Sequence, residues 1–162
     1  MAEGAGADGR GFELPLLLFA GFRSLLDELH AELAREGHAG VRPAYGFALQ
    51  AVGIGGATAS EMGRRLGVSK QAAGKTVDRL EALGYVERTD DPADGRRKVV
   101  RLTGRGIDVL VRSAVIFDRL HAEWARKLGV GRLAEVEGAL REAVPGDFFR
   151  LDAASWFSGE GR

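Results

Sequence analysis

The chain has 162 residues, of which 45% are hydrophobic and 28% charged, and its formal net charge is zero. This length suits one domain, or one domain extended by extra helices. The absence of cysteine excludes disulfides, thiolate catalysis and cysteine-ligated zinc. The apolar runs at 14–22 and 109–117 are too short or too interrupted to span a bilayer, and the first residues lack a signal-peptide pattern. A cytoplasmic protein without membrane association is therefore expected.

The neutral total hides an uneven distribution of charge. Residues 60–105 contain eleven Lys and Arg and seven Asp and Glu, a net of +4, whereas the remainder contains twelve basic and sixteen acidic residues, a net of −4. A basic segment between acidic flanks is typical of a nucleic-acid contact surface on a neutral protein. Solvated helices also vary by a few charges, so charge alone does not decide.

Two helices are expected in the first third of the chain. Residues 1–11 are rich in Gly and Ala and are expected to be disordered. Leucine and phenylalanine then recur at three- and four-residue steps, which predicts a helix over 13–36 that ends at Gly37. Pro43 opens a second helix over 43–53.

Two short helices follow in quick succession. Thr58 and Glu61 form a capping box that starts a helix over 58–66. A glycine ends that helix, and Ser69 is a good N-cap for the next one, over 70–83. Two helices joined by a short glycine-containing turn are the signature of a helix-turn-helix.

The second of these helices divides into two faces. Its apolar residues, expected in the core, are Ala73, Val77, Leu80 and Leu83. The other face suits the major groove of DNA, because glutamine pairs with adenine edges and lysine with guanine edges or phosphates. DNA contacts are expected from Ser69, Lys70, Gln71, Gly74, Lys75 and Thr76.

Gly74 is unusual because glycine inside a helix costs about 0.5–1 kcal/mol relative to alanine. Either a close approach to DNA or close packing within the protein would explain it, and the sequence does not rank the two. The run Gly-Lys-Thr at 74–76 also ends a phosphate-binding loop. The first glycine of that motif is replaced by Ser69 and no buried strand precedes it, so a nucleotide site is rejected.

A β-hairpin is expected directly after the helix-turn-helix. Strand-like runs at 85–89 and 98–102 flank the polar segment DDPADGRR, which is expected to be the loop. Arg96 and Arg97 at its tip would reach a minor groove, where narrow A·T tracts attract arginine. A solvated turn is the alternative, and the neighbouring helix-turn-helix argues against it.

The remainder is expected to be helical. Thr103 caps a long helix to about residue 128, and a last helix over 131–143 precedes an aromatic tail that the pattern does not resolve. The first, long and last helices carry more apolar surface than a small winged domain covers, so a two-fold homodimer is expected. The apolar stripe expected on the long helix is Ile107, Leu110, Val111, Ala114, Phe117, Leu120 and Trp124.

Residues 57–106 closely resemble the DNA-binding core of MarR-family transcriptional regulators. The resemblance runs from the capped helix through Asp94-Gly95-Arg96, the D-x-R of the wing, into the Leu-Thr-x-x-Gly that begins the long helix. It implies a mainly α fold with a small β-hairpin wing: a winged helix-turn-helix over 43–105, with dimerisation helices over 12–42 and 106–162.

The resemblance also implies function. Such a protein is a homodimeric regulator that binds double-stranded DNA at a pseudo-palindromic operator and responds to a small molecule, and we expect a repressor. By the family's pattern Arg96 enters the minor groove, Asp94 steadies the wing and residues 69–76 head the recognition helix. Arg97 and Lys98 complete the expected wing contacts. A winged protein-interaction module without operator binding is the alternative, against which the basic segment argues.

A small lipophilic or phenolic effector would bind between the helices and the winged lobe. The aromatic residues expected there are Phe22, Tyr45, Phe117 and Trp124, with a purely structural core role as the alternative. His30, His38 and His121 are expected to be structural or surface residues, so no metal site and no cofactor are expected. No catalytic arrangement is recognisable, and the protein is not expected to be an enzyme.

Overall fold

The structure, a computed structural model, describes residues 11–144. The expectations for residues 1–10 and for the aromatic tail from residue 145 lie outside this range. Within it no helix is long and apolar enough to cross a membrane. The elements, in chain order, are α1 (Glu13–Arg35), α2 (Pro43–Val52), α3 (Ala59–Leu66), α4 (Lys70–Ala82), β1 (Val86–Asp91), β2 (Asp94–Leu102), α5 (Gly104–Leu128) and α6 (Val130–Ala143).

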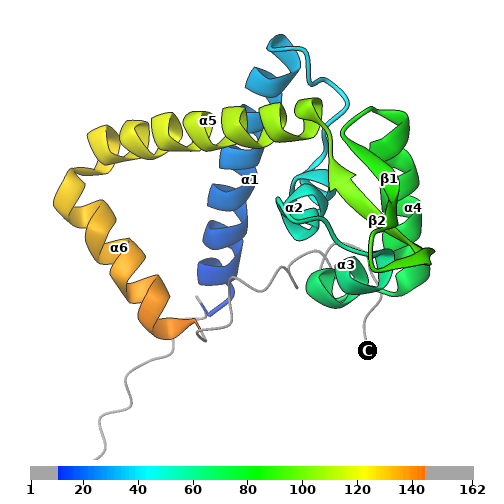
Figure 1. Ribbon diagram of the computed structural model, residues 1–162. Coiled ribbons are helices and arrows are strands. Elements are labelled where there is room, and N and C mark those ends of the chain that lie inside the picture. The colour runs from blue at the N-terminus through cyan, green and yellow to red at the C-terminus, as the bar shows by residue number, and fades with distance from the viewer. Residues whose placement is uncertain (1–10, 145–162) are drawn as a thin grey trace, which may run out of the picture.

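The long helix α5 connects two parts of the molecule (Figure 1). At its beginning lies a lobe of α2, α3, α4 and the two antiparallel strands. α1 packs against α5, and α6 folds back from the far end of α5. This arrangement confirms the expected fold, a mainly α protein with a small β-hairpin wing and helices from both ends of the chain beside each other.

The core lies in the lobe and at its junction with α5. It combines residues of every lobe helix with both strands, and Ala57 forms a β-bridge to Val100 that ties the start of α3 to β2. Gly106 brings α5 against the lobe, because a Cβ at this position would lie 2.1 Å from the Tyr85 carbonyl oxygen. Only glycine fits so close an approach. The residues less than 2% exposed with the largest side chains are Tyr85, Leu33, Leu49, Met62, Leu80, Leu120, Val52, Val77, Val86, Val100 and Val109.

The stripe expected on α5 is only partly right: Leu120 is buried and Leu110 packs against the core, but other members are exposed. The helix buries Gly106, Val109, Ile116 and Leu120, whereas Ile107, Val111 and Phe117 of the expected stripe are exposed, Val111 by 58%. The helix has apolar residues on two sides, and the sequence pattern merged them into one. One side packs on the chain's own lobe and α1, and the other faces away from the described residues.

The wing also differs from the expectation. β1 and β2 are longer than predicted and pair down to Asp91 and Asp94, so the loop has two residues instead of eight. Asp91 accepts a hydrogen bond from the Ala93 N–H, and Asp94 accepts one from the Arg96 N–H. These aspartate–backbone bonds favour a tight turn, which allows the polar residues to continue the strands.

Candidate nucleic-acid interface

Local signals position the helix-turn-helix as expected. The Thr58 hydroxyl accepts from the Glu61 N–H while the Glu61 carboxylate accepts from the Thr58 N–H, which is a complete capping box. The bonds from the Thr58 backbone and then its hydroxyl hold the pKa of Glu61 below its usual value. Ser69 caps α4 by accepting from the Ala72 N–H.

The turn between α3 and α4 depends on two glycines. Gly67 adopts the left-handed conformation, with φ of 66°, that ends α3. Gly63 lies where an added Cβ would be 2.9 Å from the Val68 carbonyl oxygen. This close contact, which no sequence pattern indicated, fixes α3 against the turn.

α4 presents a buried and an exposed face. Ala73, Val77 and Leu80 are fully buried, as expected. Leu83, expected beside them, is 38% exposed, because α4 ends at Ala82 and the chain turns away there. On the opposite face Lys70, Gln71 and Lys75 are exposed with no hydrogen bond or ion pair to any side chain in residues 11–144.

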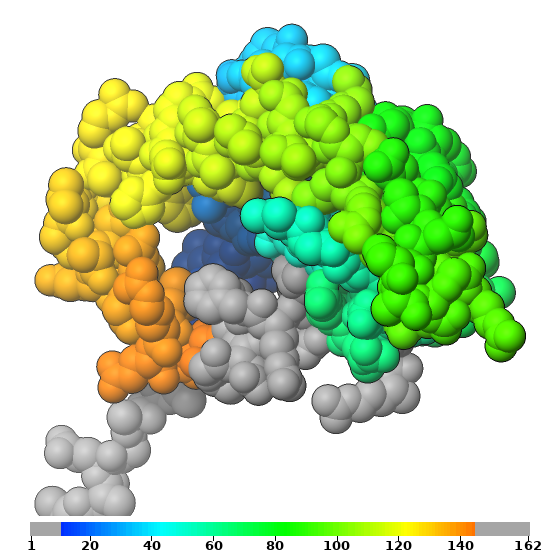
Figure 2. Space-filling view, in the orientation of Figure 1, coloured from blue at the N-terminus to red at the C-terminus, as the bar shows by residue number. Residues whose placement is uncertain are grey.

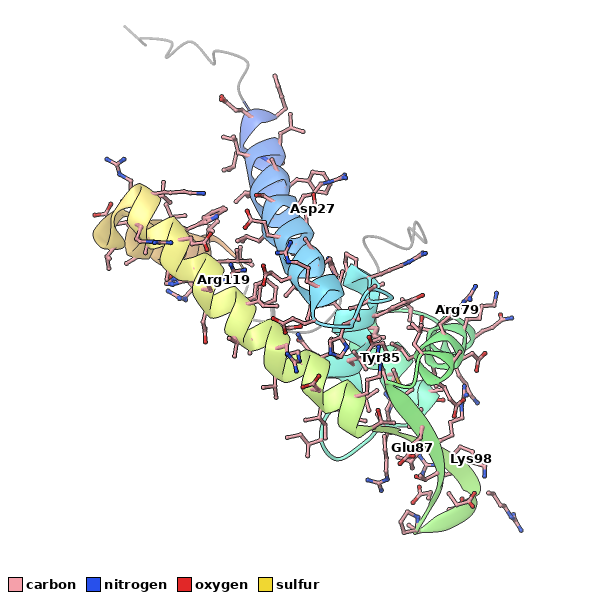
Figure 3. The ribbon with its side chains drawn as sticks, turned by 90° about the horizontal axis from the view of Figure 1, so that it is seen from above. Asp27, Arg79, Tyr85, Glu87, Lys98 and Arg119 are labelled. Carbon is pink, nitrogen blue, oxygen red and sulfur yellow. The ribbon has the colours of Figure 1, made fainter. Side chains whose placement is uncertain are left out.

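The exposed face is longer than expected. Gln71, Lys75 and Arg79 follow at four-residue steps, so they form one row along the helix. Arg79 is exposed on the outer side of α4 (Figure 3) and has no ion-pair partner among the described residues. The four-residue spacing was the signal that could have added Arg79 to the predicted set.

Two polar residues of α4 are already bonded within the chain. The Thr76 hydroxyl donates to the Ala72 carbonyl oxygen at 3.2 Å, and Asp78 forms an ion pair with Arg88 of β1. Arg88 also pairs with Glu81. These bonds hold the wing against α4, so a DNA contact from Thr76 would have to share its hydroxyl.

The structure tests one of the two explanations for Gly74, close packing within the protein. A Cβ added at Gly74 would meet no atom within 4 Å among the described residues. Close packing within this chain therefore does not require the glycine. Close approach by DNA stays a prediction.

The wing carries four residues expected to contact DNA, all exposed. The Asp94 carboxylate accepts from the Arg96 N–H at 3.0 Å, which is a contact that steadies the turn. Arg97 lies 4.0 Å from Asp91, and Lys98 forms an ion pair with Asp90 across the hairpin. Arg96 differs, because its guanidinium has no ion pair or hydrogen bond within residues 11–144. The wing projects from the lobe with Lys98 on its outer part (Figure 3).

The four predicted effector-pocket aromatics lie on three helices. Trp124 of α5 lies against α1, since its ring is 3.2 Å from where a Cβ of Gly21 would be. Phe22 and Phe117 are each over a third exposed, whereas Tyr45 of α2 packs against the core of the lobe. A shallow hollow in the molecule is lined by Glu123, Arg126 and Lys127 and by none of these aromatics.

The histidines have different surroundings. His38 is 3% exposed and contacts Tyr85 and Asp108, and His121 bonds to Glu137 on α6. His30 is half-buried on α1. In the part of the chain that the structure describes, no three His, Cys, Asp or Glu side chains come together as a metal site.

These features define a winged helix-turn-helix in which the exposed face of α4 carries Lys70, Gln71, Lys75 and Arg79. The model of the MarR family matches residues 39–97 of this chain, from the loop before α2 to the beginning of β2. The fold and this match assign the chain to the class of winged helix-turn-helix proteins.

Individual relatives agree with this assignment. The chain is 30% identical over 89 residues to the multiple antibiotic resistance protein MarR of Escherichia coli, a match that covers 54% of this chain and 62% of that protein. A crystal structure of YusO from Bacillus subtilis has 25% identity and a TM-score of 0.65, covering 85% of this chain and 99% of that one. A mutant of E. coli MarR complexed with operator DNA has 24% identity and a TM-score of 0.64, covering 82% and 94%.

The sequence matches are partial. The matching segment spans 62% of the length of E. coli MarR. It spans 28% of the length of a second curated relative, the uncharacterized HTH-type transcriptional regulator YcgE of Bacillus subtilis. At 24% identity the likeness to the DNA complex of E. coli MarR establishes the fold of this chain.

Proposed function

We propose that this protein is a homodimeric transcriptional repressor that binds a pseudo-palindromic DNA operator and is released by a small-molecule effector. The observation that carries the proposal is the exposed face of α4, where Lys70, Gln71 and Lys75 have no intramolecular partner among the described residues. Solvated cations without partners are available for phosphates and base edges. Arg96 on the adjacent wing, whose guanidinium has no partner within residues 11–144, supports the same function.

The docking follows from the dimensions of DNA. α4 enters the major groove with its N-terminal residues against the base edges, as recognition helices do. The wing then lies along the neighbouring minor groove, where Arg96 binds best if the groove is narrow. The open space at Gly74 allows the DNA backbone or a thymine methyl to approach α4 closely.

Exposed apolar residues on the terminal helices support the homodimer. On α1, Leu14, Leu16 and Leu17 are each more than half exposed. On α6, Val130 is 76% exposed. Figure 2 shows open space bounded by α5, α6 and α1. Apolar surface of this extent marks an interaction site, and the same helices of a second copy would cover it with two-fold symmetry.

The proposal is tested by the DNA that the protein selects. Purified protein is mixed with fragmented genomic DNA, and the retained fragments are sequenced. We expect enrichment of a pseudo-palindrome with half-sites one helical turn apart, about 34 Å. Retention without sequence enrichment would contradict operator binding and favour the interaction-module alternative.

Arg96→Ala should weaken binding to the selected operator by about tenfold, the effect of losing one charge-assisted contact. The residue is exposed and its side chain has no partner among the described residues, so the fold and the dimer should be unaffected. The matched control is Arg132→Ala on α6, which removes an exposed arginine away from the lobe. Equal operator affinities of wild type and Arg96→Ala at physiological salt would show that Arg96 of the wing does not contribute to DNA binding.

Effector control requires a ligand that binds one arrangement of the dimer better than another. The α1–α5 contact near Trp124 supports this proposal, because it joins the terminal helices to the helix that carries the lobe. Operator affinity is measured with a panel of phenolic and hydrophobic compounds. A true effector lowers DNA affinity, and DNA lowers effector affinity by the same factor.

Trp124→Ala and Phe117→Ala should abolish the effector response and keep operator binding, with Tyr45→Ala as a further variant. Circular dichroism checks that each variant folds. If no compound shifts operator affinity and the variants only unfold, the pocket is wrong and these aromatics are structural.

A further inference from the structure

A polar cluster with a buried histidine at its centre joins the winged lobe to α1 and α5. Its centre is His38, in the loop after α1, which is the one buried polar or charged residue among those described. His38 Nδ1 lies 3.0 Å from the Tyr85 hydroxyl, and Nε2 lies 3.0 Å from Oδ2 of Asp108 on α5. The joint cluster, as we call it, consists of Glu36, His38, Tyr85, Arg105, Asp108 and Arg112.

Arginines extend these contacts to the surrounding backbone and carboxylates. Arg112 Nε donates to Asp108 at 2.9 Å, and its Nη1 donates to Glu36, at the end of α1, at 2.7 Å. Arg105 donates to the carbonyl of Gly37 at 2.8 Å, and its guanidinium lies 4.9 Å from the centre of the Tyr85 ring. The cluster thus connects α1, the loop after it, the exit from α4 and the first turns of α5.

The hydrogen bonds in the cluster are directional and satisfied. The hydrogen bond from Arg112 and then that from His38 hold the pKa of Asp108 below its usual value. An ionised carboxylate only accepts, so Nε2 of His38 carries a hydrogen, and in the neutral ring Nδ1 accepts from the Tyr85 hydroxyl. Among the described residues no buried side-chain nitrogen or oxygen lacks a partner.

The position of Tyr85 links the cluster to α4, the proposed recognition helix. α4 ends at Ala82, and the Tyr85 N–H donates to the carbonyl of Leu80, in the last turn of α4, at 2.9 Å. The Tyr85 carbonyl accepts from the Thr103 N–H at the start of α5. Figure 3 shows Tyr85 where α5, α4 and the end of α1 converge. A shift of Tyr85 would therefore move α4 relative to α1 and α5.

We propose that the joint cluster sets the angle between the winged lobe and the terminal helices, and thereby the half-site spacing that the dimer accepts. This inference rests on the proposed function. Apolar contacts between helices tolerate sliding, whereas the hydrogen bonds of His38 and Asp108 have defined directions. One base pair moves a half-site by about 3.4 Å and turns it by about a tenth of a helical turn. A rigid joint between the lobe and the terminal helices lowers the affinity for an operator with altered spacing. A loose joint lets the lobe move, so the affinity falls less.

The test measures spacing discrimination. The operator selected by wild type is synthesised with its native spacing and with one base pair added or removed between half-sites, and the affinity ratio is determined. Tyr85→Phe removes only the hydroxyl and keeps the buried ring, and Arg112→Gln alters a side chain that is 42% exposed. Both should fold. Each should reduce the affinity ratio by about tenfold, the effect of one charge-assisted or buried hydrogen bond on an equilibrium.

Two further variants distinguish positioning from general stability. Ile116→Val removes one buried methyl group from α5, one turn beyond Arg112, and should lower stability with the affinity ratio unchanged. In Arg112→Lys the single ammonium group can bond to Asp108 or to Glu36, whereas the guanidinium bonds to both through separate nitrogens. This variant should therefore give an affinity ratio between those of wild type and Arg112→Gln.

The outcomes separate the two proposals. An unchanged affinity ratio in folded Tyr85→Phe and Arg112→Gln would overturn the role of the joint cluster and leave operator binding intact. An equal loss of discrimination in Ile116→Val would also overturn it. Wild type that binds no fragment specifically would overturn the proposed function itself.

Discussion

Leu17→Glu is expected to convert the protein from a dimer into a monomer and to weaken operator binding by about 10²–10⁴-fold. Leu17 is 62% exposed in the single chain, so the substitution costs the fold of one protomer little. In the proposed dimer the same position is covered by apolar surface, where an unpaired carboxylate is strongly disfavoured. Without the dimer, a second copy of α4 is no longer held close to the second half-site.

The measurement combines sedimentation with operator affinity. Ile54→Glu is the matched control, because it places the same charge at an aliphatic side chain that is 98% exposed in the loop between α2 and α3. That variant should remain dimeric. A Leu17→Glu protein that sediments as a dimer would show that this part of α1 is not the interface.

The helices of the lobe could be predicted from the sequence because local signals set where they begin and end. Thr58 with Glu61, Ser69 and Thr103 each act through atoms within three residues, and all three caps form as expected. Pro43 begins α2, and Gly67 ends α3. Such signals need no knowledge of the rest of the fold.

The buried face of α5 and the lengths of the two wing strands were harder to predict from the sequence. The apolar residues of α5 serve two sides, so a single stripe through Val111 and Phe117 could not be right. In the wing both faces of the hairpin tip are solvated, which removes the alternation that marks a strand. The polar run from Asp90 to Arg97 was therefore predicted to be a loop.

The joint cluster could not be predicted at all. His38 is separated from Tyr85 by 47 residues and from Asp108 by 70. The burial of His38 depends on how the end of α1 packs against the beginning of α5. No local sequence pattern predicts that packing. The sequence permitted only the statement that His38 was structural or at the surface.

Gln71→Ala and Lys75→Ala are expected to change DNA binding in different ways. Loss of a bidentate bond from Gln71 to a base edge should cost about 1–3 kcal/mol at the preferred operator and relax the preference at one base position. Loss of a phosphate contact from Lys75 should weaken all sequences alike and reduce the salt dependence by about one unit of slope.

The physical reason lies in what each side chain recognises. A glutamine amide presents a donor and an acceptor that match adenine, whereas an ammonium group is a point charge that any phosphate satisfies. Arg79, one turn beyond Lys75 on α4, is the matched comparison: Arg79→Ala should behave like Lys75→Ala if these two side chains lie along the DNA backbone. Binding is measured for the selected operator, for single-base variants of it and for unrelated DNA over a range of salt concentrations. Altered base preference in Lys75→Ala together with a uniform loss in Gln71→Ala would mean that the two residues exchange roles, with Lys75 at the bases and Gln71 at the backbone.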